Sequence, residues 1–322
     1  MFINILLLIL GMALLVKGAD WFVNGSSAIA KALRIPPLVV GLTLVSMGTS
    51  APEASVSIHS ALNGMSDMSI GNVVGSNIFN TLLILGVSSI IVPLSVCKEM
   101  KKYDVPVMIV IYAVLILFSF VITPFRLDIY EAVTMLVIFI GYTVFLILRT
   151  NRENQRKKKS GQISGEQRAE SNAKPLWLSL LFAAVGLAGI IFGGNIVVDN
   201  AAAVAKALGM SETLVGLTIV AVGTSLPELV TSIVASIKKE DAIALGNVVG
   251  SNIFNIVFIL GLSSAISPLT FDRTAITDMA VMFGSGLLVM IIALIGKKTT
   301  RIQGILMTFL YIAYFIYIII RN

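Results

Sequence analysis

The chain has 322 residues and a net charge of +6, yet only 12% of its residues are Asp, Glu, Lys or Arg, whereas 57% are apolar. About a quarter of the residues of a soluble domain are charged, so this composition excludes a soluble enzyme, a disordered protein and a nucleic-acid-binding protein. The single cysteine, Cys97, excludes an internal disulfide and a cysteine-based metal site.

Apolar runs separated by charged or turn-rich breaks predict ten membrane-spanning helices, since about 20 apolar residues cross roughly 30 Å of hydrocarbon. The first run lacks the basic start and cleavage site of a signal peptide, so we expect it to be retained. In chain order the predicted spans are 2–22, 36–61, 68–92, 104–123, 128–148, 176–199, 213–237, 243–267, 276–296 and 303–320. This pattern predicts an all-α integral membrane protein.

A polar, highly charged segment separates the fifth and sixth spans and divides the chain into 1–148, a linker at 149–175, and 176–322. If the spans cross alternately, 19 of the 23 Lys and Arg residues lie on the linker side. The positive-inside rule then predicts a cytoplasmic linker and both termini outside. The excess of positive charge is therefore attributed to topology rather than to an acidic partner.

The two halves repeat one another with an offset of 175 residues. GLTLVSMGTSAPE at 41–53 matches GLTIVAVGTSLPE at 216–228, and GNVVGSNIFN at 71–80 recurs unchanged at 246–255. Such similarity indicates gene duplication. Because each copy contains five spans, an odd number, the second copy is expected to cross in the opposite direction. Inverted five-helix repeats are typical of transporters, with the substrate site where the repeats meet, although channels can contain them too.

Two acids, Glu53 and Glu228, lie deep within apolar spans at equivalent positions of the two copies. Placing an ionisable group at mid-bilayer costs a free energy on the order of 3 kcal/mol. Because the chain carries this cost at two equivalent positions, we infer that the two acids have a function. The alternative is that protonated acids join helices by hydrogen bonds. Pro52 and Pro227 precede the acids and are expected to disturb the helix there, which frees backbone carbonyls.

Oxygen-bearing side chains surround each acid at helical spacing. Thr49 and Ser50 precede Glu53, and Thr224 and Ser225 precede Glu228. The second motif adds polar stripes with a spacing of four residues: Asn72, Ser76 and Asn80, and Asn247, Ser251 and Asn255. Alone, these stripes are equally consistent with polar contacts between helices. Beside a buried acid they favour an all-oxygen shell, which suits Ca²⁺ and disfavours Zn or Cu.

The paired motifs, GTSAPE and GTSLPE, each followed by GNVVGSNIFN, resemble those of the cation/Ca²⁺ exchanger superfamily, especially its prokaryotic Na⁺/Ca²⁺ exchanger branch. The resemblance implies alternating access, with the first and sixth helices sliding across the other eight. It also implies a role for each oxygen-bearing residue: Glu53 and Glu228 as shared Ca²⁺ and Na⁺ ligands; Thr49 and Thr224 as backbone-oxygen donors; Ser50, Ser76, Ser225 and Ser251, with the carbonyls of Ser46 and Ala221, as flanking Na⁺ ligands; and Asn80 and Asn255 in the middle.

The chain departs from this pattern at the central asparagines, because many relatives carry Asp at one of those two positions. Asn80 and Asn255 therefore remove a possible third carboxylate, which leaves the ion stoichiometry and K⁺ dependence open. Asp20 and Asn24, near the inner end of the first span, are interpreted as solvated helix-end residues, and the alternative is that they line an ion entrance.

The predicted function is Na⁺/Ca²⁺ antiport that exports Ca²⁺ across the plasma (inner) membrane of a prokaryote. Ca²⁺ and Na⁺ are the predicted transported ions, the lipid bilayer is the environment, and no prosthetic group or obligate protein partner is expected. H⁺/Ca²⁺ or K⁺-dependent exchange is the nearest alternative, and a cation channel is a more distant one. An enzyme is not expected, because HExxH and paired intramembrane aspartates are absent and the lone His59 has no evident catalytic partner.

Overall fold

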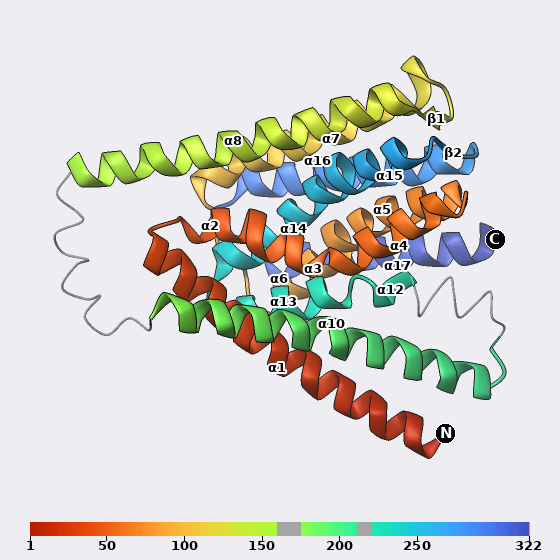
Figure 1. Cartoon of the computed structure of the whole chain (residues 1–322), viewed down its shortest axis with the longest axis horizontal. Coiled ribbons are helices and arrows are strands. Elements are labelled where there is room, and N and C mark those ends of the chain that lie inside the picture. Colours follow the sequence, from red (N-terminus) through yellow and green to blue (C-terminus); the bar gives the residue numbers. More distant parts are fainter. Residues whose placement is uncertain (160–174, 211–220, 322) are drawn as a thin grey trace.

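The computed structural model describes residues 1–159, 175–210 and 221–321, and this part of the chain is helical apart from two short strands (Figure 1). The first half contains α1 (Phe2–Leu33), α2 (Pro37–Val40), α3 (Ser46–Thr49), α4 (Ala51–Leu62), α5 (Ser66–Ile78), α6 (Leu85–Ile91), α7 (Val105–Leu117), β1 (Arg126–Leu127) and α8 (Ile129–Lys159). The second contains α10 (Leu176–Ala207), α12 (Ala221–Gly223), α13 (Leu226–Ile237), α14 (Asp241–Phe254), α15 (Gly261–Ile266), β2 (Leu269–Thr270), α16 (Thr274–Ile295) and α17 (Arg301–Arg321).

Five π-helical segments interrupt the α-helices within the described residues. They are η1 (Gly41–Val45), η2 (Phe79–Ile84), η3 (Met100–Asp104), η4 (Phe118–Ile122) and η7 (Asn255–Leu260). π-helical turns are frequent at functional sites, and η2 and η7 contain the asparagines that the sequence places at the centre of the site. The apolar spacing along the chain did not predict these segments.

Eight helices in the described part are long and apolar enough to cross a membrane, so the protein is a multi-pass membrane protein. They correspond to eight of the ten predicted spans. The predicted span 36–61 is instead divided at Ser50 into a helix over Pro37–Thr49 and α4. Of the predicted span 213–237, the structure describes α12 and α13, and residues 213–220 lie outside the described residues.

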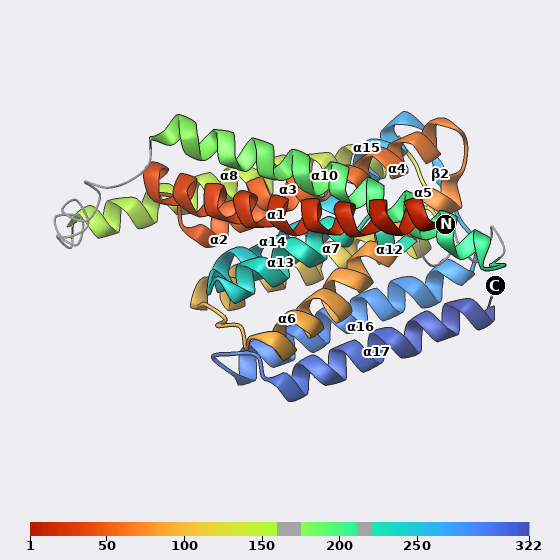
Figure 2. The same cartoon turned by 90° about the horizontal axis from the view of Figure 1, so that it is seen from below.

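Helices α1 and α10 run side by side in opposite directions, as both views show (Figures 1 and 2). Glycines allow their backbones to approach closely. A Cβ atom added to Gly18 would lie 2.7 Å from the backbone nitrogen of Ile190, and one added to Gly25 would lie 2.6 Å from that of Ala183. Any larger residue at these positions must push the two helices apart.

The centre of the molecule is formed by α4, α5, α13 and α14 (Figure 1). Among the described spans, the helix over Asp241–Ile266 is the most deeply buried. In its most apolar stretch 94% of the residues are buried, against 72% in the equivalent helix over Ser66–Ile91. Gly250 allows part of this close packing, because a Cβ there would lie 2.7 Å from Leu42 Cα.

Two tertiary contacts fix the outer helices. Strands β1 and β2 pair in antiparallel fashion, with Arg126 opposite Thr270. At the other end, Arg149 of α8 donates from Nη1 to both carboxylate oxygens of Asp104, at 3.0 and 3.1 Å. Both side chains are buried, so each ion compensates the desolvation of the other.

Candidate cation-binding site

Each predicted acid lies in the first turn of a helix that begins at a break. Ser50 separates α3 from α4, Ser225 separates α12 from α13, and both have non-helical backbone angles near φ −80° to −91° and ψ 6° to 9°. Pro52 and Pro227 follow within the first two helical positions, where a missing N–H is tolerated. The predicted interruption is confirmed, and it places each carboxylate beside a helix N-terminus, which favours negative charge.

The two carboxylates are held by serines of the opposite half. Ser50 Oγ donates to Glu228 Oε1 at 2.8 Å, and Ser225 Oγ donates to Glu53 Oε1 at 2.8 Å. Both acids are only 1% exposed and lie close enough to interact electrostatically. The halves thus meet in a crossed arrangement in which neither acid is bound by the serine beside it in the sequence.

The first asparagine of each polar stripe joins neighbouring helices. Asn72 Nδ2 donates to the carbonyl oxygen of Glu53 at 3.2 Å and to Ser57 Oγ at 2.8 Å. Asn247 makes the equivalent pair of contacts, with the Glu228 carbonyl at 3.4 Å and Ser232 Oγ at 3.0 Å. These two residues therefore make the interhelical contacts that the sequence left as an alternative.

The remaining predicted hydroxyl groups lie around the two breaks. Ser76 Oγ lies 3.1 Å from Ser225 Oγ, and Ser251 Oγ lies 3.5 Å from the Ser46 carbonyl oxygen. Thr49 Oγ1 lies 3.1 Å from both the Val45 carbonyl oxygen and Asn247 Oδ1. Thr224 interacts with Glu53, and Ala221 begins the short helix that leads to the second break.

A layer of four amides crosses the centre beside the acids. Asn80 Nδ2 donates to Asn252 Oδ1 at 3.2 Å, and Asn255 Nδ2 donates to Asn77 Oδ1 at 3.0 Å. Asn77 and Asn252 are absent from the sequence-predicted site. Their signal was present, because each lies three residues before a predicted asparagine on one helical face, but nothing in the sequence showed that it contacts the other half.

Four buried acceptor oxygens at this centre have no hydrogen-bond partner among the described residues. They are Glu53 Oε2, Glu228 Oε2, Asn80 Oδ1 and Asn255 Oδ1. Buried polar atoms without partners are costly, and these four are related in pairs by the sequence repeat. A hard cation such as Ca²⁺ or Na⁺ binds carboxylate and carbonyl oxygens, so the donor set fits such an ion. Within the described ranges no cluster of three or more acidic, His or Cys residues occurs, which leaves two carboxylates to balance its charge.

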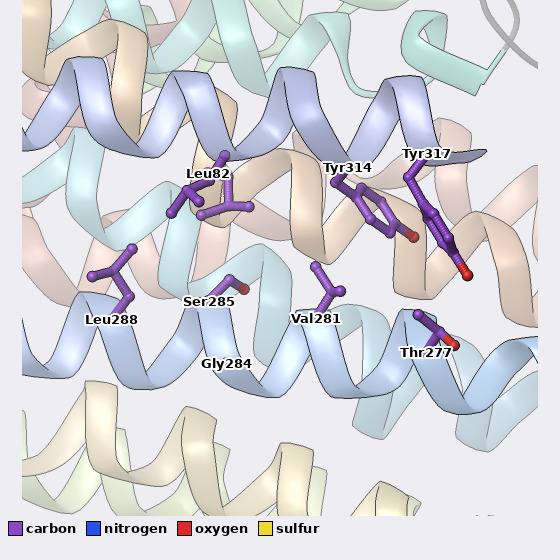
Figure 3. Close-up of a pocket in the computed structure, with 9 residues that line it drawn as sticks. Leu82, Thr277, Val281, Gly284, Ser285, Leu288, Tyr314 and Tyr317 are labelled. Carbon is purple, nitrogen blue, oxygen red and sulfur yellow. The ribbon is translucent and has the colours of Figure 1, made fainter. Parts of the chain in front are cut away.

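A separate pocket of about 350 Å³ lies between α16 and α17 (Figure 3). Its wall is mainly apolar, with Leu82 of η2 and Val281 and Leu288 of α16, and Tyr314 and Tyr317 lie at one end. None of the predicted site residues lines it. The pocket is therefore distinct from the polar centre between the halves.

The structure confirms that Asp20 and Asn24 are solvated, since Asp20 is partly exposed and Asn24 is exposed, but α1 continues to Leu33, so they do not lie at its end. Lys238 Nζ lies 2.6 Å from Asp20 Oδ1 and donates to Asn24 Oδ1 at 2.6 Å. Ser27 Oγ donates to Glu240 Oε1 at 2.6 Å. These contacts, which we call the α1 latch, bind the C-terminal half of α1 to the turn between α13 and α14.

Comparisons with known proteins agree over nearly the whole chain. Residues 3–148 and 178–320 match the family model described as sodium/calcium exchanger protein. The putative antiporter CaxA of Alkalimonas amylolytica is 35% identical, with 98% of each chain covered, and the sodium/calcium exchanger MaX1 of Methanosarcina acetivorans is 34% identical, again with 98% of each covered. A solved structure of the sodium-calcium exchanger NCX_Mj has a TM-score of 0.80 at 32% identity and covers 97% of each chain.

Proposed function

The chain belongs to the sodium/calcium exchanger protein family, and from that membership we propose that it exchanges Na⁺ for Ca²⁺ and exports Ca²⁺ from the cytoplasm. Membership makes it a cation/Ca²⁺ antiporter of a membrane rather than a member of an enzyme family. The coupling ion and the direction of transport are the specific parts of the proposal.

The observation that carries the proposal is the set of four unpartnered oxygens around two buried carboxylates. Two negative charges balance one Ca²⁺ or two Na⁺, and both ions take oxygen ligands. Since both compete for Glu53 and Glu228, one ion must leave before the other binds. Competition for a single site produces exchange rather than cotransport.

We assign ligand roles as the family resemblance implies. Glu53 and Glu228 are the shared ligands, and Asn80 and Asn255 contribute their free amide oxygens. The hydroxyl and backbone oxygens of the remaining predicted residues complete flanking Na⁺ sites: Ser46, Thr49, Ser50, Ser76, Ala221, Thr224, Ser225 and Ser251. The contacts of Ser50, Ser76 and Ser225 with the acids and with each other support this assignment.

The transport cycle is proposed to use two inverted five-helix halves, 1–148 and 176–322, joined by a cytoplasmic linker at 149–175. The broken segment containing α4 and the one containing α13 run in opposite directions in Figure 1, which supports inversion. In this cycle the glycine-packed pair α1 and α10 slides over the other eight helices and opens the site to each side in turn. The membrane is the plasma membrane of a prokaryote, with both termini outside.

The test is Na⁺-gradient-driven ⁴⁵Ca²⁺ uptake into proteoliposomes containing the purified full-length protein. We expect uptake by the wild type and background uptake by Glu53→Gln and Glu228→Gln, because each variant loses half of the negative charge of the site. Asp272→Asn removes an exposed acid beyond β2 and serves as the matched control with full uptake. Full exchange by either glutamine variant would contradict the site assignment.

The alternative coupling ions are separated in the same vesicles. Under a clamped voltage, Ca²⁺ uptake driven by a pH gradient without Na⁺ would identify H⁺/Ca²⁺ exchange, and a requirement for K⁺ would identify K⁺-dependent exchange. Ca²⁺ flux without any counter-ion, at rates far above a carrier cycle, would identify a channel. We expect flux only with a Na⁺ gradient.

A further inference from the structure

Each half orients an amide of the other half in the central layer. Asn252 Oδ1 accepts from Asn80 Nδ2, and Asn77 Oδ1 accepts from Asn255 Nδ2. The two bonds correspond to one another through the offset of 175 residues, and all four side chains are at most 1% exposed. The pattern therefore belongs to both halves rather than to one local helix contact.

The orienting amides are themselves fixed by further hydrogen bonds. Asn77 Nδ2 donates to the carbonyl oxygen of Asn252 at 3.1 Å, and Asn252 Nδ2 donates to Thr81 Oγ1 at 2.8 Å. The Thr81 hydroxyl donates in turn to the carbonyl oxygen of Asn77 at 2.7 Å. A half-turn of either amide would set two donors or two acceptors against each other, so the network holds one orientation.

Orientation matters for an amide ligand because its two ends are chemically opposite. The carbonyl oxygen of asparagine binds a cation, whereas the NH₂ group repels it, and a half-turn about the last torsion exchanges them. The bonds to Asn252 and Asn77 occupy the NH₂ groups of Asn80 and Asn255. Their oxygens are then the atoms left without a partner. A carboxylate at the same position would offer an oxygen in either orientation.

We propose that Asn77 and Asn252 are positioning residues that hold the carbonyl oxygens of Asn255 and Asn80 toward the cation. They act through those two amides rather than as ligands, and they allow neutral side chains to serve at both central positions. The inference rests on the proposed function, since it requires that Ca²⁺ binds at this centre.

The test measures Ca²⁺ binding to the purified full-length protein by titration calorimetry in Na⁺-free buffer. We expect Asn252→Leu to raise the Kd on the order of 10- to 100-fold, the usual effect of losing a residue that orients a metal ligand. Asn252→Asp keeps an acceptor for Asn80 Nδ2 and is expected to bind Ca²⁺ at least as tightly as the wild type. In transport assays Asn252→Leu should raise the Ca²⁺ concentration for half-maximal rate and leave the maximal rate unchanged.

Crossed double variants separate positioning from a general structural role. In an Asn80→Asp background, Asn252→Leu should leave the Kd unchanged, because the carboxylate needs no orienting partner. In an Asn255→Asp background, Asn77→Leu should likewise have no effect. The opposite combinations, Asn255→Asp with Asn252→Leu and Asn80→Asp with Asn77→Leu, should retain the full loss relative to their own Asp background.

Three results would overturn the inference. The first is an unchanged Ca²⁺ Kd in Asn252→Leu, and the second is a rise in Kd in Asn252→Asp as large as in Asn252→Leu. The third is an Asp substitution that cancels the effect of a Leu substitution outside the pairs Asn80 with Asn252 and Asn255 with Asn77. Thermal unfolding without Ca²⁺ checks that each variant is folded, and the Asp variant decides the matter if the Leu variant does not fold. A wild-type protein that binds no Ca²⁺ would overturn the proposed function as well. Wild-type binding with an unaffected Asn252→Leu variant would overturn this inference alone.

Discussion

At the scale of single residues, the site combines few charges with many neutral oxygens. The acids Glu53 and Glu228 are predictable from sequence because a carboxyl group within an apolar span is costly and occurs at equivalent positions of the repeat. Asn77 and Asn252 were missed because their partners Asn255 and Asn80 lie in the other half. Local spacing shows which residues share a helical face, but it does not show which faces meet.

A third carboxylate introduced at the centre should tighten Ca²⁺ binding. Asn255→Asp places a negative charge where the Asn255 oxygen has no partner, and we expect the Ca²⁺ Kd to fall at least tenfold, since charges a few ångströms apart interact by a few kcal/mol at an effective dielectric constant near 20. The new acid binds the cation only when deprotonated, so the gain should be present at high pH and be lost as the pH falls through its pKa. Calorimetric titration at several pH values measures both effects.

The matched control is Asn63→Asp, which adds the same charge at an exposed turn after α4. It should leave the Ca²⁺ Kd unchanged. Equal effects of the two variants would show that the affinity responds to overall charge rather than to the central position.

At the scale of helices, apolar runs predicted the long spans well but not their internal form. The break at Ser50 could be anticipated from Pro52, because proline removes a backbone donor. The π-helical segments η2 and η7 could not, since they are short and largely apolar and no residue in them marks the wider turn. These segments carry Asn80 and Asn255, so the part of the helix that the sequence described least well lies at the proposed site.

The close contact of α1 with α10 predicts a strong effect of one added methyl group. A Cβ on Gly18 would lie 2.7 Å from the backbone nitrogen of Ile190 in α10. We therefore expect Gly18→Ala to destabilise the protein by about 1–3 kcal/mol, as overpacking does. Thermal unfolding in detergent measures the change. Gly141→Ala in α8 makes the same substitution where no described atom lies within 4 Å, and it should be neutral or stabilising. Equal losses in both variants would refute close packing as the cause.

The α1 latch is expected to hold α1 against the turn that follows α13. The Lys238–Asp20 pair is partly exposed, so its loss should lower the free energy of separating α1 from that turn by about 1 kcal/mol or less. In a Cys97→Ser background, we expect Lys238→Ala to increase thiol labelling of Ser236→Cys, a buried position on α13, by up to about fivefold. Lys239→Ala, one residue further along, is the matched control and should leave labelling unchanged. An equal increase in both variants would exclude a role for the latch.

At the scale of the whole molecule, the sequence predicted the membrane class and the family, because charge content and the duplicated motifs extend over nearly all of the chain. It did not predict how closely the two halves pack, with a Cβ on Gly250 only 2.7 Å from Leu42 Cα. A repeat in sequence constrains local structure equally in both copies but does not show which faces of the copies meet.

The proposed topology predicts that equivalent turns face opposite sides of the membrane. In a Cys97→Ser background, an impermeant maleimide should label Asn63→Cys in intact cells and Lys239→Cys only after permeabilisation. Both positions are exposed, and they lie at the ends of α4 and α13. Native Cys97 must be removed although burial raises the pKa of its thiol and slows its reaction. Labelling of both cysteines from one side would contradict the inverted arrangement.

The crossed bonds from Ser50 to Glu228 and from Ser225 to Glu53 also constrain biosynthesis. The ribosome completes the first half while the residues that satisfy Glu53 are still untranslated. An early intermediate therefore holds an acid in the bilayer without its serine, and the site forms only when the second half has been inserted. Quality control by membrane proteases should consequently act on chains that stall between the halves, because such chains expose the polar surface that the complete protein encloses.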